Sequence, residues 1–105
     1  MGTKPRSKPE RLAEKLVQIR NALGLSQSGM LARLEAEELI VVKQISAYEV
    51  GKREPNLTIL LQYARVAGVP TEVLIDDDLD LPDKLPGTAN HEQIKRAYTP
   101  RHKKP

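Results

Sequence analysis

The feature that most restricts the fold is the segment Ile45–Pro55, in which a short helical pattern runs into a glycine and then a basic loop. Ile45 and Tyr48 lie three residues apart, so a helix places both on one face, where they can point into a core. Gly51 is a favourable residue for ending a helix, and Pro55 follows it as a second stop. The segment therefore predicts a short helix, from Val41 or Val42 to Val50, with one buried face.

The opposite face of this helix carries Lys43, Gln44 and Ala47. Long polar side chains on an exposed helical face, followed by Lys52 and Arg53, are typical of a helix that lies in a nucleic-acid groove and is held to phosphates. An ordinary solvated helix face fits the same pattern. The pattern alone favours that simpler interpretation.

Apolar spacing and end signals predict two helices before this segment. The first is amphipathic over residues 10–23 and ends at Gly24. Its apolar face consists of Leu12, Leu16, Ile19 and Leu23. Ser26 is a good N-cap for a second helix, from Gln27 to about Leu34. The residues it is expected to bury are Met30, Leu31 and Leu34. In the ambiguous stretch 35–41, residues 35–38 either extend this helix or form a turn, and Leu39–Ile40 are expected to tuck beneath it.

Two more helices are expected after the segment. Asn56 caps a fourth helix that ends at Gly68, and a short fifth helix runs from Pro70 or Thr71 to Ile75. The residues expected in their buried faces are Leu57, Leu60, Leu61, Ala64, Val73 and Leu74. Tyr48 and Tyr63 are expected in the core.

Residues 76–105 contain four prolines and no sustained period, which predicts a mostly extended or disordered tail, with a nascent helix near His91–Tyr98. The organisation expected is therefore all-α. A flexible basic arm, 1–9, precedes a compact bundle of five short helices, 10–75, and the tail, 76–105, follows it.

Composition narrows the class of protein. Seventeen Lys and Arg residues outnumber fourteen Asp and Glu residues, and the basic residues gather at both ends of the chain around two acidic clusters. This distribution favours a polyanionic partner, although basic tails often serve solubility alone. There is no cysteine, no secretory signal and no apolar run approaching the roughly 18 residues that span a bilayer. We therefore expect a soluble, cytoplasmic protein.

Signals for metal binding or catalysis are weak. The run Asp76–Asp80 places carboxylates at calcium-loop spacing, but Leu81 and Gly87 stand where that loop needs glycine and glutamate. His91 and His102 have no partners at metal-ligand spacing. We find no glycine-rich phosphate loop, nucleophile elbow or pair of catalytic carboxylates. We expect no enzyme, no metal and no cofactor.

Three segments together resemble the phage-repressor and Cro-like, or XRE-like, helix-turn-helix family over about residues 10–75. They are Gly24–Gln27, Ile45–Pro55 and Leu57–Pro70. The resemblance implies a lambda-repressor-like DNA-binding domain. The chain departs from the family pattern at Leu31, where a small residue is usual, and at Glu35, where glycine is usual. It also has about four extra residues between the paired helices, which lengthens the tight turn of the simple motif.

The resemblance implies a set of DNA-contacting residues. The third helix would enter the major groove and meet base edges through Val42, Lys43 and Ala47, with Gln44 and Ser46 at the margin. Lysine can donate to guanine, and valine or alanine methyls can touch a thymine methyl, so this set would read sequence weakly.

The expected phosphate contacts come from the start of the second helix and the loop after the third. They are Gln27, Ser28, Lys52 and Arg53. Other roles fit these residues: Gln27 would also serve as an ordinary first residue of its helix, and the two cations would also face the negative end of the third helix. In the family, the glutamate at the position of Glu49 helps to brace the fold.

These observations predict a sequence-specific transcriptional regulator that binds double-stranded DNA. It would act as a homodimer, because one short helix reads only a few base pairs, with Val73–Leu81 as the pairing surface. The alternative is an antitoxin or protein-interaction module whose 76–105 tail folds onto a partner protein. A third hypothesis is a basic protein that coats nucleic acid without sequence preference.

Overall fold

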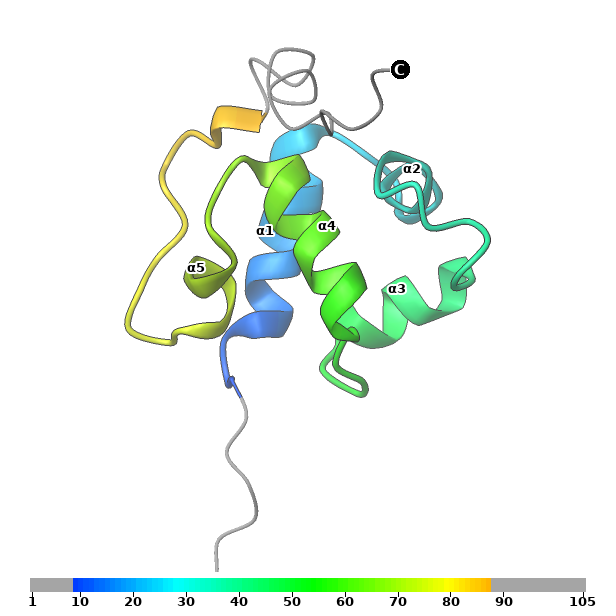
Figure 1. Cartoon of the computed structure of the whole chain (residues 1–105), viewed down its shortest axis with the longest axis horizontal. Helices are drawn as coiled ribbons and strands as arrows, with labels where there is room; N and C mark the ends of the chain where they lie inside the picture. Colours follow the sequence, from blue (N-terminus) through cyan, green and yellow to red (C-terminus); the bar gives the residue numbers. More distant parts are fainter. Residues whose placement is uncertain (1–8, 88–105) are drawn as a thin grey trace, which may run out of the picture.

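Helix α1, Leu12–Leu23, runs through the middle of the molecule, and the other helices pack around it (Figure 1). The computed structural model describes residues 9–87. The helices that follow α1 are α2 (Gln27–Arg33), α3 (Val42–Glu49), α4 (Leu57–Ala67) and α5 (Thr71–Ile75). Helix α1 contacts α3, α4 and α5, while α2 contacts α3. The described residues contain no strand, so the expected all-α bundle of five helices is confirmed.

The predicted end signals act as expected at most helix ends. The side chains of Ser26 and Asn56 accept hydrogen bonds from the backbone N–H groups of Gly29 and Ile59, both at 2.9 Å, and so cap α2 and α4. Gly24 and Gly68 follow α1 and α4 in the left-handed conformation, with φ of 70° and 77°. Helix α1 begins at Leu12, slightly later than predicted.

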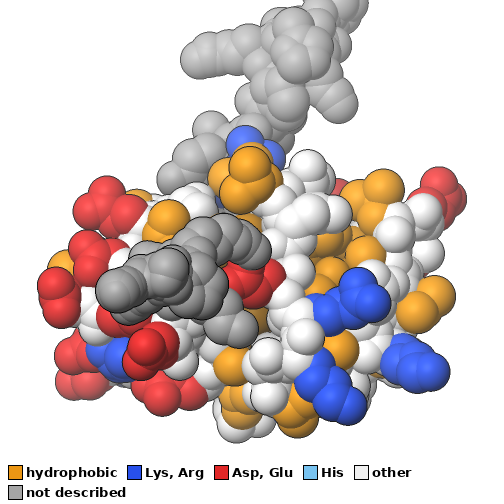
Figure 2. All heavy atoms as spheres, turned by 90° about the horizontal axis from the view of Figure 1, so that it is seen from below, with side chains coloured by type: hydrophobic (Ala, Val, Ile, Leu, Met, Phe, Trp, Pro, Cys, Tyr) orange, Lys and Arg blue, Asp and Glu red, His pale blue; other side chains and the backbone are white. Residues whose placement is uncertain are grey.

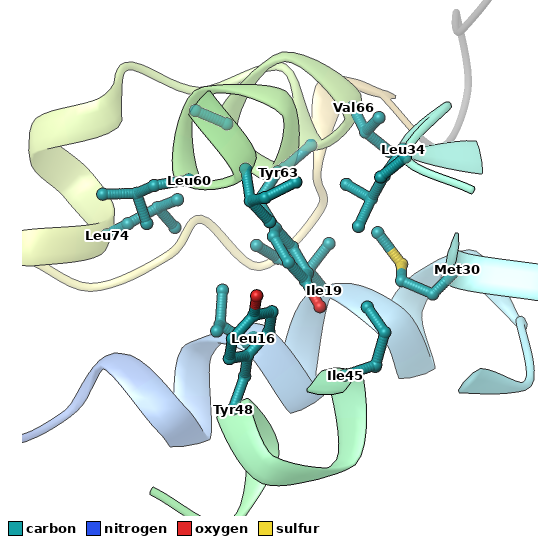
Figure 3. Packing of buried hydrophobic residues seen from close by; sticks show 14 of the residues in the cluster. Leu16, Ile19, Met30, Leu34, Ile45, Tyr48, Leu60, Tyr63, Val66 and Leu74 are labelled. Carbon is teal, nitrogen blue, oxygen red and sulfur yellow. The ribbon is translucent and has the colours of Figure 1, made fainter. Parts of the chain in front are cut away.

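The core receives side chains from all five helices (Figure 3). Tyr63 sits at its centre and is fully buried. Its hydroxyl has no hydrogen-bond partner among the described residues, and burial raises the pKa of Tyr63 far above its usual range. The other fully buried large hydrophobic residues are Leu16, Ile19, Met30, Leu34, Ile45, Ile59 and Leu74.

Two of the residues predicted to be buried in α4 are exposed instead. Leu57 is 82% exposed and Leu61 is 39% exposed, so this part of the prediction is wrong. The buried stripe of α4 continues around the helix to Ile59, Tyr63 and Val66, which leaves Leu57 and Leu61 at its edge. Leu31 and Val73, also expected to be buried, are half-buried.

The connection between α2 and α3 is a turn and does not extend α2. Glu35 takes up the left-handed conformation with φ of 57°, at the position where the resembled family has glycine. The backbone N–H groups of Glu35 and Ala36 donate to the carbonyls of Ala32 and Leu31, at 2.9 and 3.3 Å, which is the Schellman pattern for ending a helix. A tight end to α2 therefore forms here without glycine.

Only one residue of the Leu39–Ile40 pair tucks under the turn. Ile40 is 6% exposed, whereas Leu39 is 62% exposed, so the expectation for Leu39 is wrong. Ala36 and Ile40 fill the space beneath the turn, and the backbone N–H of Ile40 donates to the carbonyl of Ala36 at 3.0 Å. This closed turn directs Leu39 into solvent.

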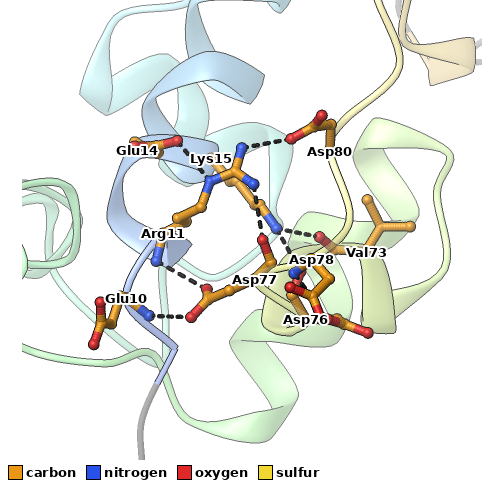
Figure 4. A network of polar contacts seen from close by, with 9 residues as sticks. All are labelled: Glu10, Arg11, Glu14, Lys15, Val73, Asp76, Asp77, Asp78 and Asp80. Carbon is orange, nitrogen blue, oxygen red and sulfur yellow. Dashed lines mark hydrogen bonds and ion pairs between the residues drawn. The ribbon is translucent and has the colours of Figure 1, made fainter.

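The acidic run after α5 binds the start of α1 (Figure 4). The Asp77 carboxylate accepts hydrogen bonds from the backbone N–H groups of Glu10 and Arg11, at 2.9 and 3.0 Å. These two bonds lower the pKa of Asp77 below its ordinary value. The Arg11 guanidinium donates in return to the Asp77 carbonyl at 2.9 Å and to the Asp80 carboxylate at 2.7 Å. Asp77 therefore caps α1, which explains why the helix begins at Leu12.

Lys15 performs the reciprocal task for α5. Its side chain is fully buried, and its Nζ donates to the carbonyls of Val73 and Asp76, at 2.8 and 3.0 Å. These carbonyls lie at the C-terminal end of α5, where a cation is favoured. Charged groups of α1 and of the acidic run thus stabilise each other's helix ends.

The acidic run therefore has a structural role. No three His, Cys, Asp or Glu residues gather as metal ligands within residues 9–87. No helix in the same range is long and apolar enough to cross a membrane.

Residues 81–87 continue the packing along the domain. Leu85 is 4% exposed, and Gly87 lies so close to α4 that an added Cβ would stand 1.9 Å from the carbonyl oxygen of Val66. The part of the tail up to Gly87 is therefore packed against the helices. The nascent helix expected near His91–Tyr98 lies outside the described residues.

We predict that Glu35→Gly stabilises the fold by about 0.5–1 kcal/mol, because glycine adopts a positive φ without the steric cost of a Cβ. Urea-induced unfolding of both proteins measures the difference. Glu35→Gln is the control, because it removes the charge but keeps the Cβ. If Glu35→Gln stabilises the protein as much as Glu35→Gly, the backbone explanation is wrong.

We predict that Asp77→Asn lowers the free energy of unfolding at pH 7, and that its difference from wild type shrinks under acid. The folded-state pKa of Asp77 is lowered, so its contribution is present above the unfolded pKa, about 4, and is lost as the pH falls through the folded value. Urea titrations between pH 7 and pH 2 test this. Asp83→Asn makes the same change at an exposed position, and a similar pH-dependent loss in that variant would contradict the assignment to Asp77.

Candidate nucleic-acid interface

Helix α3 lies at the lower edge of the bundle with one face turned outward (Figure 1). Ile45 and Tyr48 are buried, at 0% and 3% exposure, which anchors the inner face as predicted. On the outer side, Val42 and Lys43 are exposed, while Gln44, Ser46 and Ala47 are half-buried. The residues expected to contact bases therefore lie on or beside a surface that folding leaves accessible.

The side chain of Gln44 is engaged at the start of α3. Its Oε1 accepts a hydrogen bond from the backbone N–H of Val41 at 3.2 Å. Gln44 is the third residue of the helix, so this bond satisfies a backbone N–H just ahead of it. Lys43, the neighbouring long polar side chain of α3, makes no hydrogen bond or ion pair in the described structure.

A carboxylate on α3 connects three helices from behind the outer face. Arg20 of α1 donates from Nε and Nη2 to the two Glu49 oxygens, at 2.7 and 3.0 Å. Gln27 of α2 donates from Nε2 to Glu49 Oε1 at 3.1 Å. The expected bracing role of Glu49 is confirmed.

Arg20 is a positioning residue that the sequence pattern did not identify. Its Nη1 also donates to the carbonyl of Leu25 at 3.0 Å, just before α2, and the Glu49 carboxylate raises the pKa of Arg20. A cation in the last turn of α1 has a sufficient local explanation in the helix dipole. Its pairing with Glu49, 29 residues along the chain, would have identified it, but residue spacing in the sequence does not reveal such a distant contact.

The residues expected to contact phosphates lie at the two ends of this arrangement. Ser28, in the first turn of α2, is exposed, and Gln27 is half-buried. After α3, Gly51 has φ of 80°, and the backbone N–H groups of Lys52 and Arg53 donate to the Ala47 carbonyl, at 2.9 and 3.3 Å. The loop backbone is thereby closed onto α3, and both cationic side chains remain exposed.

Charge is unevenly distributed over this side of the molecule. Figure 2 shows acidic side chains gathered on the left, the side of α5 and the acidic run in Figure 1, and basic side chains mixed with hydrophobic ones on the right. Apolar residues beside the start of α3 are exposed as well: Leu39, Val41 and Val42 are 62%, 59% and 38% exposed. Of these three residues, only Val42 was expected in the interface.

Comparison with known proteins assigns the family. A model of helix-turn-helix domains matches residues 16–74, which is more than half of the chain. No curated protein and no solved structure gave a match. The matched range begins within α1 and ends within α5, so it contains the braced α2–α3 pair and its closing loop. The chain belongs to the XRE-like helix-turn-helix family of DNA-binding regulatory domains.

Proposed function

We propose that this protein is a sequence-specific transcriptional regulator that reads the major groove with α3. The observation that carries the proposal is the outer face of α3, which is accessible and carries Lys43, while Arg20, Gln27 and Glu49 hold the helix from behind. In helix-turn-helix domains the residues near the start of the recognition helix contact base edges. The same end of α3 carries Val42 and Lys43.

Each proposed base contact follows from the hydrogen-bond donors or methyl groups that the side chain does not already use within the protein. Lys43 has three N–H donors for guanine acceptors, and the methyl groups of Val42 and Ala47 suit a thymine methyl. Gln44 and Ser46 lie at the margin, and Gln44 is already bonded to the backbone of Val41.

The proposed phosphate contacts are Gln27, Ser28, Lys52 and Arg53. Gln27 uses its amide group to bind Glu49, and a side-chain amide has a second N–H that suits a phosphate oxygen. Lys52 and Arg53 are exposed on a loop whose backbone is held by Ala47. Contacts of this kind set the position of the protein on the duplex without reading its sequence.

We also propose that the regulator is a homodimer. The pairing surface expected at Val73–Leu81 is partly occupied within one chain, because Leu74 is buried and Asp77 binds α1. Ile75 of that stretch is 44% exposed and lines a groove together with Leu57. These two side chains are the proposed centre of the dimer contact.

The antitoxin hypothesis remains a prediction. Residues 76–87 already pack against α1 and α4, through Asp77, Leu85 and Gly87. A partner protein would therefore bind residues 88–105 or displace the packed segment.

In vitro selection from a random duplex pool tests the proposal directly. A two-fold symmetric site is the expected product, because two copies of α3 would read equivalent half-sites. Recovery of no sequence above background would contradict sequence-specific binding and favour the interaction module.

We predict that Lys43→Ala and Lys52→Ala change DNA binding in different ways. Lys43→Ala should relax base preference at one position of each half-site, with a discrimination loss of about 1–3 kcal/mol. Lys52→Ala should weaken binding to all sequences alike and reduce the slope of log affinity against log salt by roughly one per protomer. Binding isotherms at several salt concentrations measure both effects. Lys84→Ala, at an exposed cation outside the proposed interface, is the matched control. Equal losses on every sequence from both interface variants would indicate non-specific coating.

A further inference from the structure

Three hydrophobic side chains around the start of α3 are exposed together. Leu39, Val41 and Val42 are 62%, 59% and 38% exposed, although Ile40 between them is buried at 6%. The backbone at Val41 is extended, with φ of −114° and ψ of 163°. The turn that closes onto Ala36 directs Leu39 outward, and the extended backbone at Val41 turns its side chain away from the side on which Ile40 is buried. We name these three exposed residues the apolar strip.

The apolar strip lies at the end of α3 that meets base edges when a helix-turn-helix domain docks. Val42 is the first residue of α3, and Val41 is its N-cap. Leu39 belongs to the connection that is longer in this chain than in the simple motif. The added turn therefore places apolar surface directly ahead of the recognition helix.

Few polar side chains at this end of α3 are free to form hydrogen bonds with base edges. The Gln44 side chain is bonded to the backbone of Val41, and Lys43 is the only cation within α3. A surface of this composition favours the one apolar group that the floor of the major groove presents. That group is the methyl at C5 of thymine.

We propose that the apolar strip selects a pyrimidine carrying a C5 methyl group in each half-site, with Leu39 and Val41 as specificity-determining residues beyond the α3 set. This inference rests on the proposed function. Lys43, exposed directly after Val42, supports DNA as the occupant of the strip, and Lys52 and Arg53 are exposed beyond the other end of α3. Figure 2 shows basic and hydrophobic side chains interspersed on the right, the side of α3 in Figure 1. A protein partner would also cover apolar surface, and the experiment separates the two.

The test pairs changes in DNA with changes in protein. Each thymine of the selected half-site is replaced singly by uracil, which removes only the C5 methyl. Wild type is expected to bind one of these uracil duplexes about 4-fold more weakly, the effect of losing one buried methyl. Leu39→Ala or Val41→Ala should bind the thymine and uracil duplexes at that position equally.

Val50→Ala is the matched control, because Val50 is 67% exposed at the opposite end of α3. It should keep the full preference for thymine over uracil. Thermal unfolding of all variants checks that the exposed substitutions leave the fold intact.

A further arm distinguishes the two sources of the methyl group. Cytosine and 5-methylcytosine, each paired with guanine, replace the sensitive thymine pair. Tighter binding of the 5-methylcytosine duplex than of the cytosine duplex would show that the strip reads the methyl in either pyrimidine. Equal binding of these two would restrict the assignment to thymine.

A uracil penalty of the same size in wild type, Leu39→Ala and Val41→Ala would overturn the inference and leave the strip as a protein-binding surface. A selected site that is indifferent to uracil throughout would also overturn it, while the proposed function would stand. If the selection recovered no sequence above background, both the proposed function and this inference would be wrong.

Discussion

The paired charges of Arg20 and Glu49 determine where α3 stands relative to the rest of the domain. The two side chains are only 19% and 6% exposed, and Gln27 donates to the same carboxylate. A buried pair of this kind contributes little net stability, because desolvation offsets the attraction, but the loss of one partner leaves an uncompensated charge. Its main effect is therefore geometric: one carboxylate fixes α1, α2 and α3 in a single arrangement and leaves the outer face of α3 unobstructed.

The second constraint acts at the opposite side of the bundle. Asp77 caps the start of α1, and buried Lys15 binds the carbonyls at the end of α5. The acidic run is thereby kept beside α1, where its charge lies away from the basic region over α3 (Figure 2). This separation matters for a DNA-binding domain, because carboxylates near the groove would repel phosphates.

Local sequence signals were sufficient for most of the fold. Capping by Ser26 and Asn56, and left-handed glycines after α1 and α4, were predictable because these residues act on backbone groups close in the chain. The errors at Leu57, Leu61 and Leu39 have a common origin. Apolar spacing shows that a helix or turn has a buried side, but the neighbouring helices decide how far around that side extends.

For the candidate site, residue types and their spacing were enough to predict the inner face of α3, the basic loop after it and the family to which both belong. These depend on residue type and short-range spacing, which the chain carries whatever its tertiary contacts. The bond of Gln44 to Val41, the pairing of Arg20 with Glu49, and the exposure of Leu39 and Val41 beside α3 became apparent only in the folded domain. Each of these features depends on which polar groups form hydrogen bonds with one another and which side chains fill the core. That outcome is decided by contacts between segments that are far apart in the sequence, so residue spacing does not specify it.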